Sequence, residues 1–232
     1  MEESNVTLCL ILFGEYGIKS YIYDGEMMLA VYSLCLALAL YHRNKNTYIY
    51  FKTLTSFTFV MIGIYHGYQN QNYMLVPTLL GFFVGDIMLA TKLRRSFLYG
   101  MGGFFLADVC LVYGLYHLKS VSVFDFLLPG LVMVFINVIA RNPKMHLGHY
   151  KKPMYGYGVV LSLAVSSSIG CYFLYGTGSY FFLALGMLFY FISDFLLMFQ
   201  YFYKTPHRDK LKIAKMLFYF IGTYLIAYSI GG

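Results

Sequence analysis

The sequence predicts an all-α, polytopic membrane protein, a bundle of about eight transmembrane helices. Of its 232 residues, 59% are hydrophobic and only 12% are charged, which is about half the charged fraction of an ordinary soluble domain. The apolar residues form runs close to the ~20 residues that a helix needs to cross the hydrocarbon core. The ~10-residue segments of alternating hydrophobicity found in a membrane β-barrel are missing, and lipid offers no partners to backbone groups, so helices are expected.

Eight spans are expected in a single transmembrane domain, residues 27–232. Residues 1–26 carry five acidic side chains against Lys19 alone, and their apolar run is too short to cross a bilayer. We expect this N-terminal segment to lie at the extracytoplasmic interface. The expected spans, in order, are 27–41, 48–66, 73–91, 97–117, 121–140, 154–175, 179–202 and 211–229.

Lysines and arginines alternate between the two sides of this predicted bundle. They gather in the loops after the first, third, fifth and seventh spans, with Lys212 and Lys215 just beyond the last of these, whereas the other loops and the termini contain only Lys19 and Lys119. Because an excess of Lys and Arg marks the cytoplasmic side, both termini are expected to be extracytoplasmic. The net charge of +7 is thus interpreted as a topology signal, and no nucleic-acid partner is expected. The predicted location is the plasma membrane of a prokaryote, with no oligomeric state specified.

Two aspartates, Asp86 and Asp194, lie in spans that run in the same direction. An ionisable side chain in a membrane-length apolar run is costly, so each is a candidate functional residue. Each follows a small residue and is followed by two apolar residues, a Leu and then a basic loop. Since the two sites are four spans apart, they suggest a degenerate four-plus-four internal repeat. Their common depth does not depend on that repeat.

Paired carboxylates inside a membrane favour proton chemistry. Two negative charges close together in a low dielectric are not both tolerated. One aspartate would therefore stay protonated as a general acid, and the other would be ionised as a base or as a stabiliser of a cation. The alternative is a structural role, in which each carboxyl group bonds to neighbouring helices. The matched depth favours the functional interpretation.

Other polar residues allow two interpretations each. Lys52, near the cytoplasmic end of the second span, either extends to the interface or serves as a cation for a lipid phosphate or for one aspartate. Tyr157 and Tyr155, at the comparable place on the sixth span, are belt aromatics or site residues. Asp108 in the fourth span is a third site residue or a structural partner. Asp125, near the outer end of the fifth span, is expected to reach the headgroups.

The sequence does not favour metal or serine chemistry. The six histidines fall in loops or at span ends rather than beside the aspartates, which argues against a histidine-ligated zinc hydrolase. The four cysteines show no metal-ligand spacing and are interpreted as small buried hydrophobes. Residues 166–168 are consecutive serines without a nearby histidine, and the G-x-S-x-G motif is missing. These patterns therefore favour neither a metal site nor a serine nucleophile.

Several short motifs resemble the YhhN family of multi-spanning membrane proteins, whose animal members are lysoplasmalogenases. The resemblance covers about residues 27 to 229. Its main motifs are the Gly-Asp of Gly85-Asp86 followed by Leu89, and the Ser-Asp of Ser193-Asp194 followed by Leu197. The further similarities are Lys52-Thr53-Leu54 for a family Lys-Pro-Leu, Pro153 and Tyr157 at the sixth span, and Tyr219 with Leu225-Ile226-Ala227 in the last. The departures are Asp108 and Leu111 in place of a His and a Tyr, and Thr223 in place of a Gln.

The resemblance implies hydrolysis of the vinyl ether of a 1-alkenyl lysophospholipid, which yields a fatty aldehyde and a glycerophospho-base. Vinyl ethers are cleaved by protonation of carbon, which gives an oxocarbenium ion that water attacks, and glycoside hydrolysis is the nearest physical analogue. Asp86 and Asp194 would be the acid and the carboxylate, unassigned between them. Lys52 would face the phosphate, and Tyr157 and Asp108 are the other candidate substrate-binding residues. The implied reaction needs neither a metal nor an organic cofactor, and the implied partners are this lipid and the bilayer.

Two other classes of protein compete with this hypothesis. Paired carboxylates also suit a proton-coupled transporter, and a lipid-binding protein without enzymatic activity is a related alternative. Gly85 and residues 100–103 would give such a protein flexible helices. An intramembrane aspartyl protease is disfavoured, because Phe83-Val84-Gly85 precedes Asp86 where a Gly-x-Gly would be needed.

Overall fold

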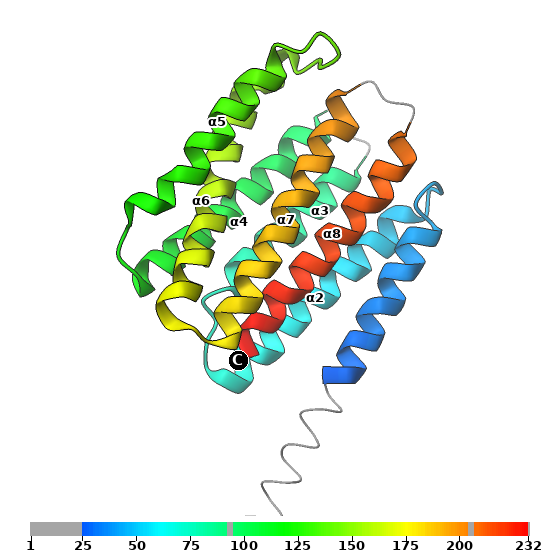
Figure 1. Cartoon of the computed structure of the whole chain (residues 1–232). Coiled ribbons are helices and arrows are strands. Elements are labelled where there is room, and N and C mark those ends of the chain that lie inside the picture. The colour runs from blue at the N-terminus through cyan, green and yellow to red at the C-terminus, as the bar shows by residue number, and fades with distance from the viewer. Residues whose placement is uncertain (1–24, 92–94, 204–206, 232) are drawn as a thin grey trace, which may run out of the picture.

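The computed structural model describes residues 25–91, 95–203 and 207–231, and this part of the chain forms one bundle of eight helices (Figure 1). The all-α membrane bundle predicted from the sequence is confirmed. The predicted interfacial segment falls outside the described residues, except for its last two. The helices are Gly25–Tyr41, α2 (Tyr48–Asn70), α3 (Val76–Ala90), α4 (Ser96–Leu118), α5 (Leu127–Ala140), α6 (Lys151–Tyr175), α7 (Gly178–Phe202) and α8 (Arg208–Tyr228).

Short 3₁₀ turns extend three of these helices. They are Val123–Phe126, Gly148–Tyr150 and Ser229–Gly231. With these extensions, the described helices that are long and apolar enough to cross a membrane are five: Ser96–Leu118, Val123–Ala140, Gly148–Tyr175, Gly178–Phe202 and Arg208–Tyr228. Gly25–Tyr41 and α3 are shorter apolar helices. α2 has the length of a span but is more polar, and it buries Lys52, Ser56 and His66 inside the bundle.

Six of the helices pack in a closed ring, in the order α2, α3, α4, α6, α7, α8 and back to α2. The other two lie outside this ring (Figure 1). The helix Gly25–Tyr41 contacts α8, where the Tyr32 hydroxyl donates to the Phe220 carbonyl at 2.6 Å, and α5 packs against α6. Helices α2–α4 and α6–α8 thus follow each other around the ring, each set accompanied by one outer helix. This is the order that a four-plus-four repeat requires.

Glycines bring two pairs of helices into close contact. A Cβ atom added to Gly103 of α4 would lie 2.8 Å from the Gly85 Cα of α3, and one added to Gly186 of α7 would lie 2.8 Å from the Gly222 carbonyl oxygen of α8. Small residues let helix backbones approach closely, and this is how helices associate in lipid, where no hydrophobic force drives them together. The pairs α3–α4 and α7–α8 are therefore the tightest seams of the ring.

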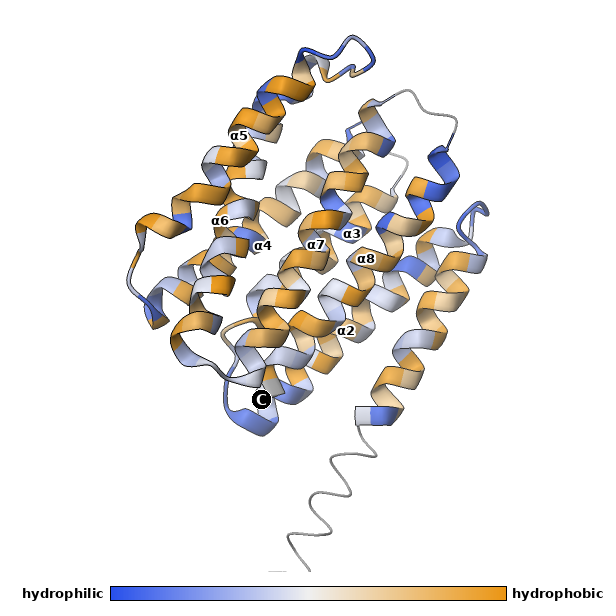
Figure 2. Ribbon diagram, in the orientation of Figure 1, coloured by the Kyte–Doolittle hydropathy of each residue, from blue (hydrophilic) through white to orange (hydrophobic). Residues whose placement is uncertain are grey.

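The bundle presents polar ends and an apolar outer surface (Figure 2). Large side chains such as Leu131 and Phe173 are exposed around its circumference, and so is Cys110, which was predicted to be buried as Cys35 and Cys171 are. Figure 1 shows that Gly25–Tyr41, α3, α5 and α7 all finish at one end of the bundle, whereas the C-terminus lies at the other. This agrees with the alternation of basic loops. Which end faces the cytoplasm stays a prediction.

The prediction that Asp125 reaches the headgroups is wrong. Its side chain is buried and forms an ion pair with Lys119, with Nζ 2.6 Å from Oδ2. The same carboxylate accepts the Ser122 backbone N–H at 2.9 Å and completes a capping box at the start of the 3₁₀ turn. Because Lys119 and a backbone donor satisfy the carboxylate inside the protein, it does not need to reach the interface.

The glycine seam between α7 and α8 can be tested with a matched pair of variants. Gly186→Ala places a methyl group against the α8 backbone, and overpacking of this kind typically costs about 1–3 kcal/mol. Gly102→Ala introduces the same methyl group in α4 where no atom lies within 4 Å, and Ala favours a helix over Gly by ~1 kcal/mol. We expect Gly186→Ala to lower the melting temperature in detergent, measured by circular dichroism, and Gly102→Ala to leave it unchanged or raise it. Equal melting temperatures for the two variants would contradict a tight seam.

Candidate functional site

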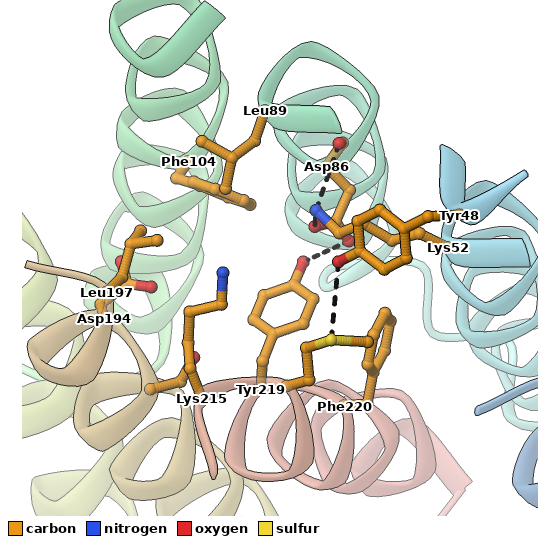
Figure 3. A pocket seen from close by; sticks show the side chains of 12 residues that line it. Tyr48, Lys52, Asp86, Leu89, Phe104, Asp194, Leu197, Lys215, Tyr219 and Phe220 are labelled. Carbon is orange, nitrogen blue, oxygen red and sulfur yellow. Dashed lines mark hydrogen bonds and ion pairs between the residues drawn. The ribbon is translucent and has the colours of Figure 1, made fainter. Parts of the chain in front are cut away.

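Asp86 and Asp194 line the same small cavity (Figure 3). The cavity lies between α2, α3, α4, α7 and α8, inside the ring. Asp86 is four residues from the end of α3, and Lys52 is four residues from the start of α2, so the cavity lies toward the end of the bundle that carries the basic loops. Its lining residues are Tyr48, Lys52, Asp86, Leu89, Phe104, Ser193, Asp194, Leu197, Lys215, Met216, Tyr219 and Phe220.

The Asp86 carboxylate is bound by one cation and two hydroxyl groups. Lys52 Nζ lies 2.7 Å from Oδ1 and also donates to the Asp86 carbonyl at 3.3 Å. Oδ2 accepts the Ser56 hydroxyl at 2.6 Å and the Tyr219 hydroxyl at 2.7 Å. Only 2% of the Asp86 surface is exposed. An ionised carboxylate at this depth is stable only if it is paired and hydrogen-bonded, and Asp86 meets both conditions.

Local sequence explains how three helices reach Asp86. Lys52 and Ser56 are four residues apart on α2, so they lie one above the other on the same face of the helix. Gly85 turns its bare backbone toward α4, where a Cβ would lie 2.7 Å from the Phe104 ring. The glycine of the Gly-Asp motif therefore makes room for α4, while Asp86 next to it faces α2 and α8.

Asp194 has different partners. The Tyr157 hydroxyl of α6 donates to its Oδ2, and the hydroxyl groups of Tyr157 and Tyr190 are 2.8 Å apart. Tyr190 is fully buried. Within residues 25–91, 95–203 and 207–231, no lysine or arginine nitrogen forms an ion pair with Asp194. One carboxylate of the cavity is thus paired with a cation, whereas the other is held by a phenol.

The structure brings together most of the residues predicted for the site. Lys52 contacts one aspartate, which is one of the roles considered for it, and Tyr157 contacts the other. Asp108 is fully buried in α4, its carboxylate oxygens have no hydrogen-bond partner among the described residues, and it is not among the residues that line the cavity. Tyr155 lies apart and donates to Asn137 at 2.5 Å.

Ser56, which binds Asp86 from outside the cavity lining, and the lining residues Tyr219 and Lys215 were not predicted to take part in the site. Ser56 could have been found from its spacing to Lys52. Tyr219 belongs to the motif noted in the last helix, but nothing in the sequence connects it to Asp86. Lys215 was counted as part of a basic end that indicates topology, yet it is half-buried and lines the cavity.

Two further, largely apolar cavities share lining residues with this one, and Asp194 lines all three. The second is lined by Phe97, Met101 and Tyr157 among others. The third lies between α5, α6 and α7 and is lined by residues such as Ile136 and Leu161. Asp194 therefore stands where a polar cavity with lysines meets a series of apolar ones.

The apolar helices and the two carboxylates at one internal cavity place this chain in the class of polytopic membrane proteins that have an acidic site inside the helical bundle. The sequence profile of the YhhN family matches residues 47–230, and the chain belongs to this family. The resemblance noted in the sequence is thereby confirmed from residue 47 onward, without the first helix. Comparison with curated proteins and with solved structures gave no match.

The Lys52–Asp86 ion pair can be tested with a double-mutant cycle. Removing one partner of a buried ion pair leaves an uncompensated charge and typically costs about 3–5 kcal/mol, so Lys52→Met alone should lower the melting temperature in detergent strongly. The double variant Lys52→Met/Asp86→Asn removes both charges and should be more stable than Lys52→Met. The cycle also needs the single variant Asp86→Asn. If the changes in stability of Lys52→Met and Asp86→Asn add up to that of the double variant, the two residues are not coupled, which would contradict the ion pair.

Proposed function

We propose that this protein is a membrane-embedded hydrolase of the lysoplasmalogenase type, which cleaves the vinyl ether bond of 1-alkenyl lysophospholipids. The observation that carries the proposal is the position of Asp194 at the junction between a polar cavity and two apolar cavities. Membership of the YhhN family supports a hydrolase. The products would be a fatty aldehyde and a glycerophospho-base.

The shape of the three cavities suits this class of lipid. A 1-alkenyl lysophospholipid has a charged glycerophospho part and a long apolar chain, and the vinyl ether joins the two. With the glycerophospho part in the cavity of Lys52 and Asp86, the chain would extend past Asp194 toward the apolar cavity between α5, α6 and α7. The bond to be cleaved would then lie beside Asp194.

The two aspartate environments suggest which residue takes which role. Asp194, which has no cation partner among the described residues, would donate a proton to the outer carbon of the vinyl ether. This gives an oxocarbenium ion, as in glycoside hydrolysis. Asp86, held ionised by Lys52, would stabilise that cation and accept a proton from the attacking water. In the breakdown of the resulting hemiacetal, the Asp194 carboxylate would take the hydroxyl proton and Asp86 would return its proton to the glycerol oxygen. This releases the aldehyde and the glycerol hydroxyl, restores both aspartates and consumes one water molecule overall.

The catalytic assignment predicts that Asp86→Asn and Asp194→Asn each lower aldehyde release at least ~100-fold, because general acid–base catalysis contributes 10²–10⁴-fold. The assay uses purified protein with a 1-alkenyl lysophospholipid, and with a 1-acyl lysophospholipid as the comparison substrate. Asp209→Asn is the matched control, since Asp209 is exposed in the first turn of α8. Melting temperature checks that each variant is folded.

Three outcomes of this assay would change the proposal. Full activity in one aspartate variant would remove that residue from the mechanism. Activity lost equally in Asp209→Asn would point to a general effect of charge. If the wild-type protein releases no aldehyde but drives proton-dependent solute uptake in proteoliposomes, the protein is a transporter rather than a hydrolase.

The chain path predicts a change of substrate preference. Leu161→Phe would narrow the apolar cavity between α5, α6 and α7, and we expect the KM for a long-chain 1-alkenyl lysophospholipid to rise about tenfold, as for a misfitted methylene-sized group. The KM for a short-chain analogue should stay the same, since a short chain ends before this point. Val134→Phe is the control, because Val134 is exposed on α5 and does not line the cavity. An equal KM rise for both chain lengths would argue against the path.

A further inference from the structure

The cavity of the two aspartates contains a second lysine that the mechanism above does not use. Lys215 comes from α8, across the cavity from Lys52 on α2. Figure 3 shows its ammonium group extending into the space between Asp194 and Tyr219 without a dashed line to any neighbour. In the described part of the chain it has no hydrogen-bond or ion-pair partner.

Two lysines and two aspartates line the cavity, so its charges balance only while both carboxylates are ionised. Lys52 and Asp86 neutralise each other at 2.7 Å, and the Asp194 carboxyl group is held by the Tyr157 hydroxyl. In the proposed mechanism Asp194 is protonated, and Lys215 is then a cation that no ionised group in contact with it compensates. Partial burial of an unpaired ammonium group is costly, and a bound anion would offset that cost. In that state the cavity has the electrostatics of an anion-binding site.

The same cavity contains a hydroxyl group, that of Tyr48, whose hydrogen-bond acceptor within the protein is weak. The Tyr48 hydroxyl lines it and donates to the Met216 sulfur at 3.6 Å. A thioether sulfur is a weak acceptor, so a phosphate oxygen would be a better partner for this hydroxyl. Lys215 and Tyr48 come from different helices and face a common space.

We propose that Lys215 binds the phosphate of the lysophospholipid headgroup. This inference rests on the proposed function for the identity of the substrate and for the protonated state of Asp194. The sequence had suggested Lys52 as the phosphate ligand. The Lys52 ammonium group is, however, already bound to the carboxylate and the backbone carbonyl of Asp86, so the phosphate is assigned to Lys215. Lys52 positions Asp86, and Lys215 sets the requirement for a charged headgroup.

The competing role of Lys215 is structural, as a long side chain that covers apolar surface and carries its charge toward the interface. Binding of an uncleavable ligand separates the two roles without depending on catalysis. The ligands are a 1-alkyl lysophospholipid, whose ether is saturated, and a 1-alkylglycerol with the same chain and no phosphate. The Kd of each is obtained from the ligand-dependent rise of the melting temperature in detergent.

We expect Lys215→Gln to weaken binding of the 1-alkyl lysophospholipid about tenfold or more, as expected for the loss of a hydrogen bond to a charged group, and to leave the Kd of the 1-alkylglycerol unchanged. Lys215→Arg keeps the charge and should retain most of the affinity. Lys210→Gln is the matched control, since it removes the same charge from an exposed position of the same helix. In the aldehyde assay, Lys215→Gln should raise the KM more than it lowers kcat.

Several results would overturn the inference. They are an unchanged Kd in Lys215→Gln, an equal loss of affinity for both ligands, or no binding of the lysophospholipid to the wild-type protein. The outcome is separable from that of the proposed function. Lys215-dependent binding without aldehyde release would contradict the proposed hydrolase activity but support the anion site. Aldehyde release with a Kd that does not depend on Lys215 would support the hydrolase activity but contradict the anion site.

Discussion

The ion pair between Lys52 and Asp86 is the interaction on which the rest of this structure depends. Neither charge is stable alone at this depth, so α2 and α3 must keep a fixed rotation and height relative to each other. The Tyr219 hydroxyl donates to the other oxygen of the same carboxylate and so extends that requirement to α8, which closes the ring. Since desolvation offsets much of the attraction within a buried pair, its main contribution is to specify one arrangement of these helices rather than to stabilise the fold.

This fixed arrangement of α2, α3 and α8 also determines where Asp194 lies. Asp194 is on α7, which is joined to α8 by the glycine seam at Gly186 and Gly222, so its position follows that of Tyr219 and Asp86. The cavity then contains two carboxylates of unlike character, one beside an ammonium group and one beside a phenol. In other enzymes, two acidic groups in different environments take the separate roles of general acid and general base.

Helix number and bounds were largely predictable, because apolar runs and loop charges record depth directly. The third span was predicted from residue 73, three residues before the observed start of α3 at Val76. Pro77 lies in the first turn, a position typical of a helix start. Contacts across helices were not predictable, since depth says nothing of rotation. Lys119 was expected in an outer loop and Asp125 at the headgroups, and nothing in the sequence indicated that they form an ion pair. Lys215 was counted with the basic residues that mark topology, although α8 turns it toward the cavity. Asp86 and Asp194 were found because a carboxylate in an apolar run stands out without knowledge of its partners.

The location of α5 outside the ring has a consequence for how such a site would meet its ligand. The apolar cavity lined by Ile136 lies between this peripheral helix and the ring, next to the hydrocarbon rather than to water. A lipid would then arrive by lateral diffusion within its own leaflet. The quantity that sets occupancy would be the mole fraction of that lipid in the membrane, so diluting the ligand with inert lipid would slow the reaction even when its amount per volume is unchanged.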